Sequence, residues 1–187
     1  MPGKEDELLA QLADPKLKAA AFSKLVRLYQ ERLYWHIRKM VLSHEDANDV
    51  LQNTLMKAWN GLDNFRGDAQ ISSWLYKIAT NETMTFLVNK RMRNIASMED
   101  VENSLINQLH ADTYFCGNEA EMMLQEAIIT LPEKQRLVFN MKYFDDLTYE
   151  AMSKILDTSV GALKASYHHA VKKIEKILSE EKILGKT

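Results

Sequence analysis

Residues 148–172 read TYEAMSKILDTSVGALKASYHHAVK, and this stretch decides the fold of the C-terminal part of the chain. Thr148 to Leu156 has the pattern of a short helix, the polar residues 157–159 follow it, and a longer helix begins near Val160. Apolar side chains recur at intervals of three and four along the longer helix: Val160, Leu163, Tyr167, Ala170, Val171, Ile174 and Ile177. Two helices joined by a short turn, the second one longer and rich in lysine, predict a helix-turn-helix.

The opposite side of the longer helix carries Gly161, Lys164, Ala165, His168 and Lys172. Side chains near the start of the second helix of a helix-turn-helix reach base edges in the major groove of DNA. Helix pairs are also common in proteins that bind no DNA, so this pattern taken alone leaves a purely structural helix pair open.

The rest of the sequence also has helical periodicity, and it shows no convincing strand pattern. We expect one helix to run to about Met40, in which Ala20, Leu25, Leu28 and Leu33 lie among charged residues. Ser43 is a good N-cap for the next helix, which Gly61 ends. Further helices are expected from near Asp68 to Leu87 and from near Glu119. The three tryptophans, Trp35, Trp59 and Trp74, are interpreted as core residues.

The charge is distributed unevenly along the chain. The net charge of the 187 residues is −2, but residues 94–133 contain no Lys or Arg and eight acidic residues. Residues 1–93 and 134–187 each have a net charge of +3 by the same count. Two basic blocks around an acidic one predict two small helical domains joined by an acidic linker, in an all-α fold. A single helical domain with an acidic face is the alternative.

Several classes of protein are disfavoured by composition. No apolar run approaches the roughly 20 residues that span a bilayer, and the polar N-terminal residues do not resemble a signal peptide. The single cysteine, Cys116, excludes an intrachain disulfide and fits a reducing cytoplasm. The five histidines lack the spacing of a helical metal site, and no nucleophile–base pair is evident. We therefore expect a cytoplasmic protein with no enzymatic activity, metal, cofactor or small-molecule substrate.

The helix expected over residues 46–59 has two faces. Its apolar face fits a core, while Asp49, Gln52, Asn53 and Met56 share the other face at spacings of three, four and seven. An exposed methionine among polar residues suits a protein-docking surface. A solvated face with no partner is the alternative interpretation.

Two further segments could contact nucleic acid. The loop Phe65-Arg66-Gly67-Asp68 combines an aromatic ring on which a base can stack with a cation for phosphate. It could also be a connector in which Phe65 fills the core. The run from Asn89 to Asn94 holds three cations in four residues, and Lys77 lies on the preceding helix. Such a cluster can follow a phosphate backbone, or it can simply complement a helix dipole.

Taken together, these segments resemble bacterial RNA polymerase sigma factors of the extracytoplasmic-function (ECF) type. Residues 46–53, DANDVLQN, are similar to the family pattern D-A-E-D-x-x-Q-E. Trp59, the 65–68 loop, residues 73–79 and Asn81 follow in the family's order. In the C-terminal part, residues 131–136, Phe139, Tyr143, 147–156 and 159–164 are similar to the family's region 4. The resemblance covers about residues 20–93 and 119–178. It implies region 2 in residues 1–93, a linker in 94–118 and region 4 in 119–187.

The resemblance also implies roles for individual residues. Docking on core RNA polymerase falls to Asp46, Asp49, Gln52, Asn53 and Met56. Recognition and melting of the −10 element fall to Phe65, Arg66, Gly67, Asp68, Lys77, Asn81, Lys90, Arg91 and Arg93. Reading of the −35 element falls to Ser159, Gly161, Ala162, Lys164, Ala165, His168 and Lys172. The implied partners are core RNA polymerase, promoter DNA and an anti-sigma factor.

The chain also departs from the family pattern. Ala162, Ala165, Ser166 and His169 replace hydrogen-bonding residues of the usual recognition segment, and Asp157 stands where a glycine often makes the turn. A helix-turn-helix repressor or activator that never docks on polymerase, and a helical regulator that binds only proteins, remain alternatives. We also consider that the two domains pack together in the free chain and cover their DNA-binding faces.

Overall fold

The computed structural model of this chain describes residues 4–65, 67, 70–94, 105–107, 109 and 119–184. Helices make up the fold, and the described residues contain no strand. The elements are α1 (Lys4–Ala13), α2 (Lys18–Val41), α3 (His44–Gly61), η1 (Leu62–Asn64), α4 (Ile71–Asn94), α6 (Glu119–Ile129), α7 (Glu133–Tyr143), α8 (Tyr149–Leu156) and α9 (Val160–Leu184). The expectation of an all-α fold is confirmed.

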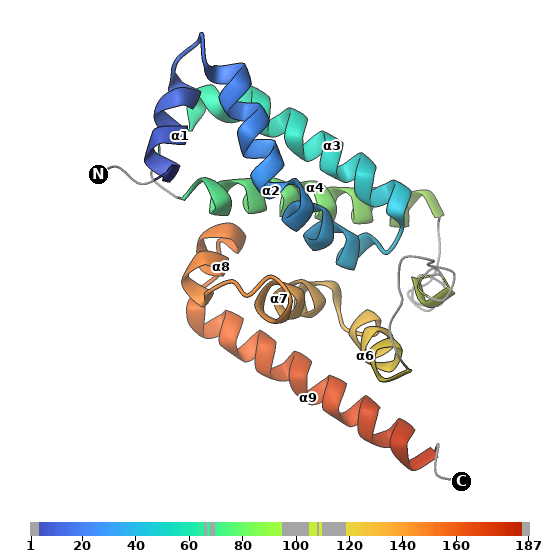
Figure 1. Cartoon of the computed structure of the whole chain (residues 1–187). Helices are drawn as coiled ribbons and strands as arrows, with labels where there is room; N and C mark the ends of the chain where they lie inside the picture. The colour runs from blue at the N-terminus through green and yellow to red at the C-terminus, as the bar shows by residue number, and fades with distance from the viewer. Residues whose placement is uncertain are drawn as a thin grey trace.

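The N-terminal half, α1–α4, is a bundle in which α2, α3 and α4 pack against one another (Figure 1). Ser43 caps α3 as predicted, because its side chain accepts a hydrogen bond of 3.2 Å from the Asp46 amide. The chain enters α3 through Leu42, whose left-handed backbone (φ 59°) ends α2. Gly61 is the last residue of α3, as expected.

Helix α1 was not predicted from the sequence. Its apolar side chains Leu8 and Leu12 are buried in the core of the bundle, and Leu9 packs against that core. Acidic residues dominate the start of this segment, and three core-facing leucines are too few for a clear periodic pattern. The helix therefore owes its position to packing on α2.

The expected core of the bundle is partly wrong. Leu25 and Leu33 are buried, but Leu28 is 63% exposed. Trp35 and Trp59 are also exposed at 44% and 37%, so the interpretation of all three tryptophans as core residues fails. A 24-residue helix turns its successive apolar residues in several directions, and only one stripe of α2 faces its neighbours.

The C-terminal half, α6–α9, contains the predicted helix-turn-helix. The Thr148 side chain accepts from the Ala151 amide at 3.1 Å and begins α8, and that of Ser159 accepts from the Ala162 amide at 3.3 Å at the start of α9. Asp157 ends α8 in the left-handed conformation (φ 49°), with its own amide bonded to the Ser153 carbonyl. The turn of residues 157–159 is thus formed as predicted, and Asp157 fills the place of the usual glycine.

The two halves lie against each other (Figure 1). Helix α7 contacts both α2 and α9, and α8 contacts α4. Side chains of α7, α8 and α9 are part of the same apolar core as the N-terminal bundle: Leu137, Val138, Met141, Met152, Ile155 and Leu163. Within the expected linker, Leu105 and Leu109 are buried with Leu42 of the first half and Ile129 of the second. The halves therefore share one interior.

Candidate functional site

The outer face of α3 is exposed at the four positions where the sequence predicts a docking surface. Asp49, Gln52, Asn53 and Met56 are all exposed, and Met56 reaches 57%. The fifth predicted residue, Asp46, is half-buried because its carboxylate binds Lys90 Nζ at 2.6 Å. At these four positions α3 therefore presents one acid, two amides and a methionine to solvent.

A mainly apolar groove of about 460 Å³ runs between α2 and α3 beside this face. Phe22 and Val26 form its α2 side, and the α3 residues include Leu51, Leu55 and Trp59. Phe22 and Trp59 meet edge to face with ring centroids 5.1 Å apart, and Lys18 Nζ lies 5.0 Å from the Trp59 ring. Trp59 is thus the wall of a surface groove rather than a core residue.

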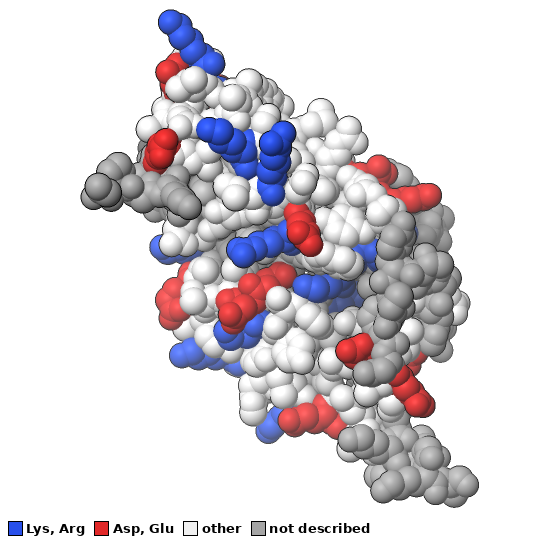
Figure 2. Space-filling model, in the orientation of Figure 1, with Lys and Arg blue, Asp and Glu red and all other residues white. Residues whose placement is uncertain are grey.

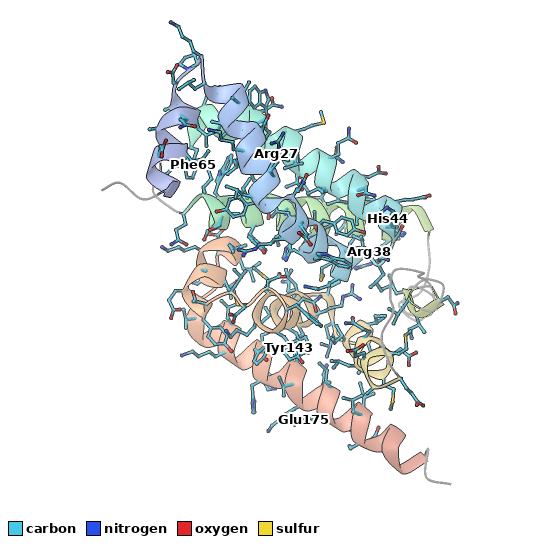
Figure 3. All side chains as sticks on the ribbon, viewed as in Figure 1. Arg27, Arg38, His44, Phe65, Tyr143 and Glu175 are labelled. Atoms are coloured by element: carbon cyan, nitrogen blue, oxygen red, sulfur yellow. The ribbon has the colours of Figure 1, made fainter. Side chains whose placement is uncertain are left out.

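The 65–68 loop is only partly described. Phe65 is half-buried, with its ring centroid 5.1 Å from that of Trp74, and it packs against the core. Figure 3 shows Phe65 beside α1. Phe65 lines a pocket together with Leu9 and Leu12 of α1. Gly67 has φ +77°, a left-handed conformation that favours glycine. Arg66 and Asp68 lie outside the described residues, and their roles in binding the −10 element stay predictions.

The predicted −10 cations whose side chains are described lie along α4, and carboxylates face them. Lys77 Nζ is 2.8 Å from Asp157 Oδ2, Lys90 binds Asp46, and Arg91 forms an ion pair with Glu133 of α7. Asn81 is exposed one turn beyond Lys77. The Arg93 side chain lies outside the described residues. In Figure 2, basic and acidic side chains alternate across the boundary between the halves on the visible face.

The face of α9 predicted to read the −35 element is open. Ser159, Gly161, Ala162, Lys164, Ala165, His168 and Lys172 are all exposed. Lys164 Nζ lies 5.7 Å from the centroid of the Tyr149 ring, which comes from α8. The seven predicted residues thus lie exposed along the first half of α9 and at the residue before it.

A buried polar cluster at the boundary between the halves was missed from the sequence. His36 of α2 is fully buried, with Nδ1 2.7 Å from Asp145 Oδ2 and Nε2 3.0 Å from Thr80 Oγ1. Lys39 Nζ donates to Asp145 Oδ1 at 3.3 Å. Burial raises the pKa of Asp145, but the His36 hydrogen bond and charge, followed by those of Lys39, outweigh it and hold the pKa below its ordinary value. These partners are more than 100 residues apart, and no local pattern signals their contact.

The same cluster affects Tyr76 of α4, whose ring meets that of His36 edge to face with centroids 5.0 Å apart. Burial, together with the nearby Asp145 charge, raises the pKa of Tyr76 to about 12. Tyr76 therefore stays protonated and neutral at any physiological pH.

The described residues contain no group of three or more His, Cys, Asp or Glu arranged to hold a metal ion. No helix in the described part of the chain has the length and hydropathy of a membrane-spanning segment. What the structure does offer is two exposed helix faces, on α3 and α9, and a cation-bearing helix between them, α4.

Comparison with known proteins gives matches in both halves. Residues 25–93 match the Sigma-70 region 2 family, and residues 121–174 match the Sigma-70, region 4 family. The chain is 30% identical to the RNA polymerase sigma-H factor of Pseudomonas aeruginosa, over 84% of this chain and 86% of that protein. It is 31% identical to the ECF RNA polymerase sigma-E factor of Escherichia coli K12, over 83% and 85%. Its identity to the Bacillus subtilis ECF factor SigW is 28%, over 86% and 90%.

Two solved structures share the fold. One is CnrH in complex with the cytosolic domain of CnrY, at a TM-score of 0.69, 21% identity, and coverage of 94% of this chain and 97% of that one. The other is the sigma factor RpoE of Bartonella quintana in complex with the anti-sigma factor NepR, at a TM-score of 0.66, 19% identity, and coverage of 84% and 96%. Both likenesses extend over most of this chain.

Proposed function

Because this chain belongs to the ECF-type RNA polymerase sigma factors, we propose that it docks on core polymerase through α3 and directs initiation at promoters. In this proposal the 65–68 loop and α4 open and read the −10 element, and α9 reads the −35 element. We assign residues 1–93 to region 2, 94–118 to a linker and 119–187 to region 4. The chain itself performs no catalysis, since the polymerase makes the RNA, and it acts in the cytoplasm with that enzyme.

One observation carries the proposal: an exposed α3 face and an exposed α9 face occur in the same chain, each within its matching sigma region. A repressor or activator that uses only the helix-turn-helix needs no region 2. The presence of region 2 over residues 25–93 therefore favours the sigma factor over that alternative.

The deciding experiment is reconstitution with core polymerase that lacks any sigma factor, on a library of genomic promoter fragments. We expect the purified chain to join core polymerase and to support transcription from a defined subset of fragments. A chain that never associates with core polymerase and supports no initiation would overturn the proposal.

We also expect an anti-sigma factor as a partner. The solved CnrH and RpoE structures contain CnrY and the anti-sigma factor NepR, respectively. Co-purification of the chain from its native cells, followed by identification of bound proteins, tests this expectation. The partner should inhibit transcription when it is added to the reconstituted reaction.

Lys164→Ala is expected to weaken promoter binding by the holoenzyme about tenfold or more, since a lost contact to a base edge costs about 1–3 kcal/mol. Affinity for core polymerase should not change, because Lys164 lies on α9 and not on α3. Lys173→Ala is the matched control, since Lys173 is exposed on the same helix but half a turn away from Lys164. Equal losses in the two variants would indicate a charge effect without a specific contact.

Gly161→Ala is expected to stabilise the chain and to weaken −35 binding. A Cβ at Gly161 meets no atom within 4 Å, so alanine fits without strain. Replacing a helical glycine by alanine stabilises by about 0.5–1 kcal/mol. The added methyl group would stand on the face that enters the groove, and DNA affinity should therefore fall while the urea midpoint rises. A parallel rise in both quantities would contradict the assignment of this face.

A further inference from the structure

We propose that the free chain inhibits itself by closing: two carboxylates of the C-terminal half bind cations of α4 that region 2 needs for promoter DNA. This inference rests on the proposed role of α4 in binding the −10 element. It concerns the chain before any partner is bound, and it is carried by contacts between the two halves.

The first contact lies near the start of α4. Lys77 Nζ donates to both carboxylate oxygens of Asp157, at 2.8 and 3.1 Å. Asp157 is the left-handed residue in the turn of the helix-turn-helix. A carboxylate here takes the place that a DNA phosphate oxygen would occupy on the same ammonium group. The turn that positions α9 therefore also carries the carboxylate that binds the Lys77 ammonium group.

The second contact lies near the other end of α4. Arg91 Nη2 forms an ion pair with Glu133, which stands in the first turn of α7. Fourteen residues separate Lys77 from Arg91, which corresponds to about 21 Å along a helix. Both ends of the cationic helix are therefore held by the C-terminal half, by residues of two different elements.

Between these two ion pairs, apolar side chains pack the two halves of the chain together. Helix α8 lies on α4, and its Met152 and Ile155 are buried in the shared core. Asp145 joins the halves through His36 and Lys39. The ion pairs thus lie at the edges of an apolar seam, and while the seam stays shut Lys77 and Arg91 are held on carboxylates of the C-terminal half.

The closure is selective, which distinguishes it from the mutual covering of both DNA-binding faces that we considered from the sequence. Lys164 and His168 of α9 remain exposed, as do the other predicted −35 residues. Lys90 binds Asp46 within its own half. Among the cations predicted for −10 binding whose side chains are described, Lys77 and Arg91 are the two held across the boundary.

Closure lowers apparent DNA affinity by the fraction of chains that are open. Weakening the closed state raises that affinity by the same factor, as long as closed chains predominate. Ion pairs at a protein surface contribute modestly, and here Lys77–Asp157 is exposed and Arg91–Glu133 is partly buried. We therefore expect their removal to raise the affinity of the free chain for single-stranded DNA about two- to tenfold. Added salt should reduce the difference between variant and wild type, because it screens the same pairs.

The test compares two double variants of the full chain that have the same net charge. The opening variant is Asp157→Asn with Glu133→Gln, because asparagine tolerates the left-handed turn and glutamine keeps the length of the side chain. The control is Asp146→Asn with Glu150→Gln. Asp146 is also left-handed (φ 49°) and pairs with Lys142 of its own half, and Glu150 is an exposed acid in the first turn of α8.

Two measurements are made on each variant. One is energy transfer between dyes on cysteines placed at the exposed positions Ser23 and Lys173, in a chain with Cys116→Ser and without DNA. The other is the anisotropy of a short fluorescein-labelled single-stranded DNA titrated with the free chain. We expect the opening variant, and not the control, to lower energy transfer and to raise DNA affinity.

If the opening and control variants bind DNA equally well, any gain over the wild type comes from the change in net charge. That result would overturn the inference. A fall in energy transfer in the control as large as that in the opening variant would also overturn it. Opening without a gain in affinity would show that α4 was not masked. Failure of the proposed function gives a different result, namely no association with core polymerase in the reconstitution.

Discussion

Replacing Asp49, Gln52 and Met56 together by alanine is expected to weaken binding to core polymerase at least a hundredfold. These side chains are exposed on one face of α3, and interface residues that matter cost more than about 1 kcal/mol each when truncated. The unfolding free energy should change little, because exposed substitutions usually stay within about 0.5 kcal/mol. Binding of the free chain to −35 duplex DNA should be spared, since α9 is untouched.

A matched control is available on α2. Leu28, Gln30 and Glu31 are exposed and offer an apolar residue, an amide and an acid, like the α3 set. The triple alanine variant of these three should bind core polymerase as the wild type does. Affinity is measured by titrating labelled chain with core polymerase. If the control loses as much affinity as the α3 variant, the docking surface is not on α3.

The second large effect is expected at Asp145. Asp145→Ala should lower the free energy of unfolding by about 1–3 kcal/mol, because it leaves polar groups of a buried cluster without their partner. Its side chain is only 4% exposed, and that of His36 is 0% exposed. Asp145→Asn keeps an accepting oxygen but no charge, and it should lie between alanine and wild type. Urea unfolding measures all three chains.

The pH dependence of this effect follows from the lowered pKa of Asp145. A carboxyl group whose folded-state pKa lies below its unfolded value stabilises the fold above the unfolded pKa, and the stabilisation is lost as pH falls through the folded pKa. The stability difference between wild type and Asp145→Asn should therefore shrink as the pH falls below about 4. Asp146→Asn, the exposed neighbour, should show no such narrowing. A difference that kept its full size below about pH 4 would contradict the assignment of the pair.

The features that could be predicted from the sequence are those that residues close together in the chain determine. Ser43 and Ser159 cap helices that begin where expected, and the helix-turn-helix needs only the apolar repeat of α9 and the polar turn before it. The outward faces of α3 and α9 follow from the same helical spacing. The resemblance added the order of these elements, which no single motif contains.

What could not be predicted depends on contacts between distant residues. Lys77 and Asp157 are 80 positions apart, and His36 and Asp145 are 109 apart. Neither contact can be predicted from the sequence pattern around its residues. Trp35 and Trp59 were misjudged for a related reason. Their size suggests burial, but α2 turns Trp35 and α3 turns Trp59 toward the surface. Helix α1 was missed because packing on α2, rather than its own sequence, holds it.

The shared interior of the two halves has a consequence for how the chain unfolds. Because Val138, Met141 and Met152 belong to the same core as Leu25 and Leu33, the closed chain should melt in one cooperative transition. Once the halves separate, each half should unfold in a transition of its own. The C-terminal half then relies on a small core of its own, made of Ala127, Ile128, Leu131, Phe139, Ala170 and Ile174. The lifetime of an open chain is set by its weaker half, and polymerase that holds both halves also protects them from unfolding.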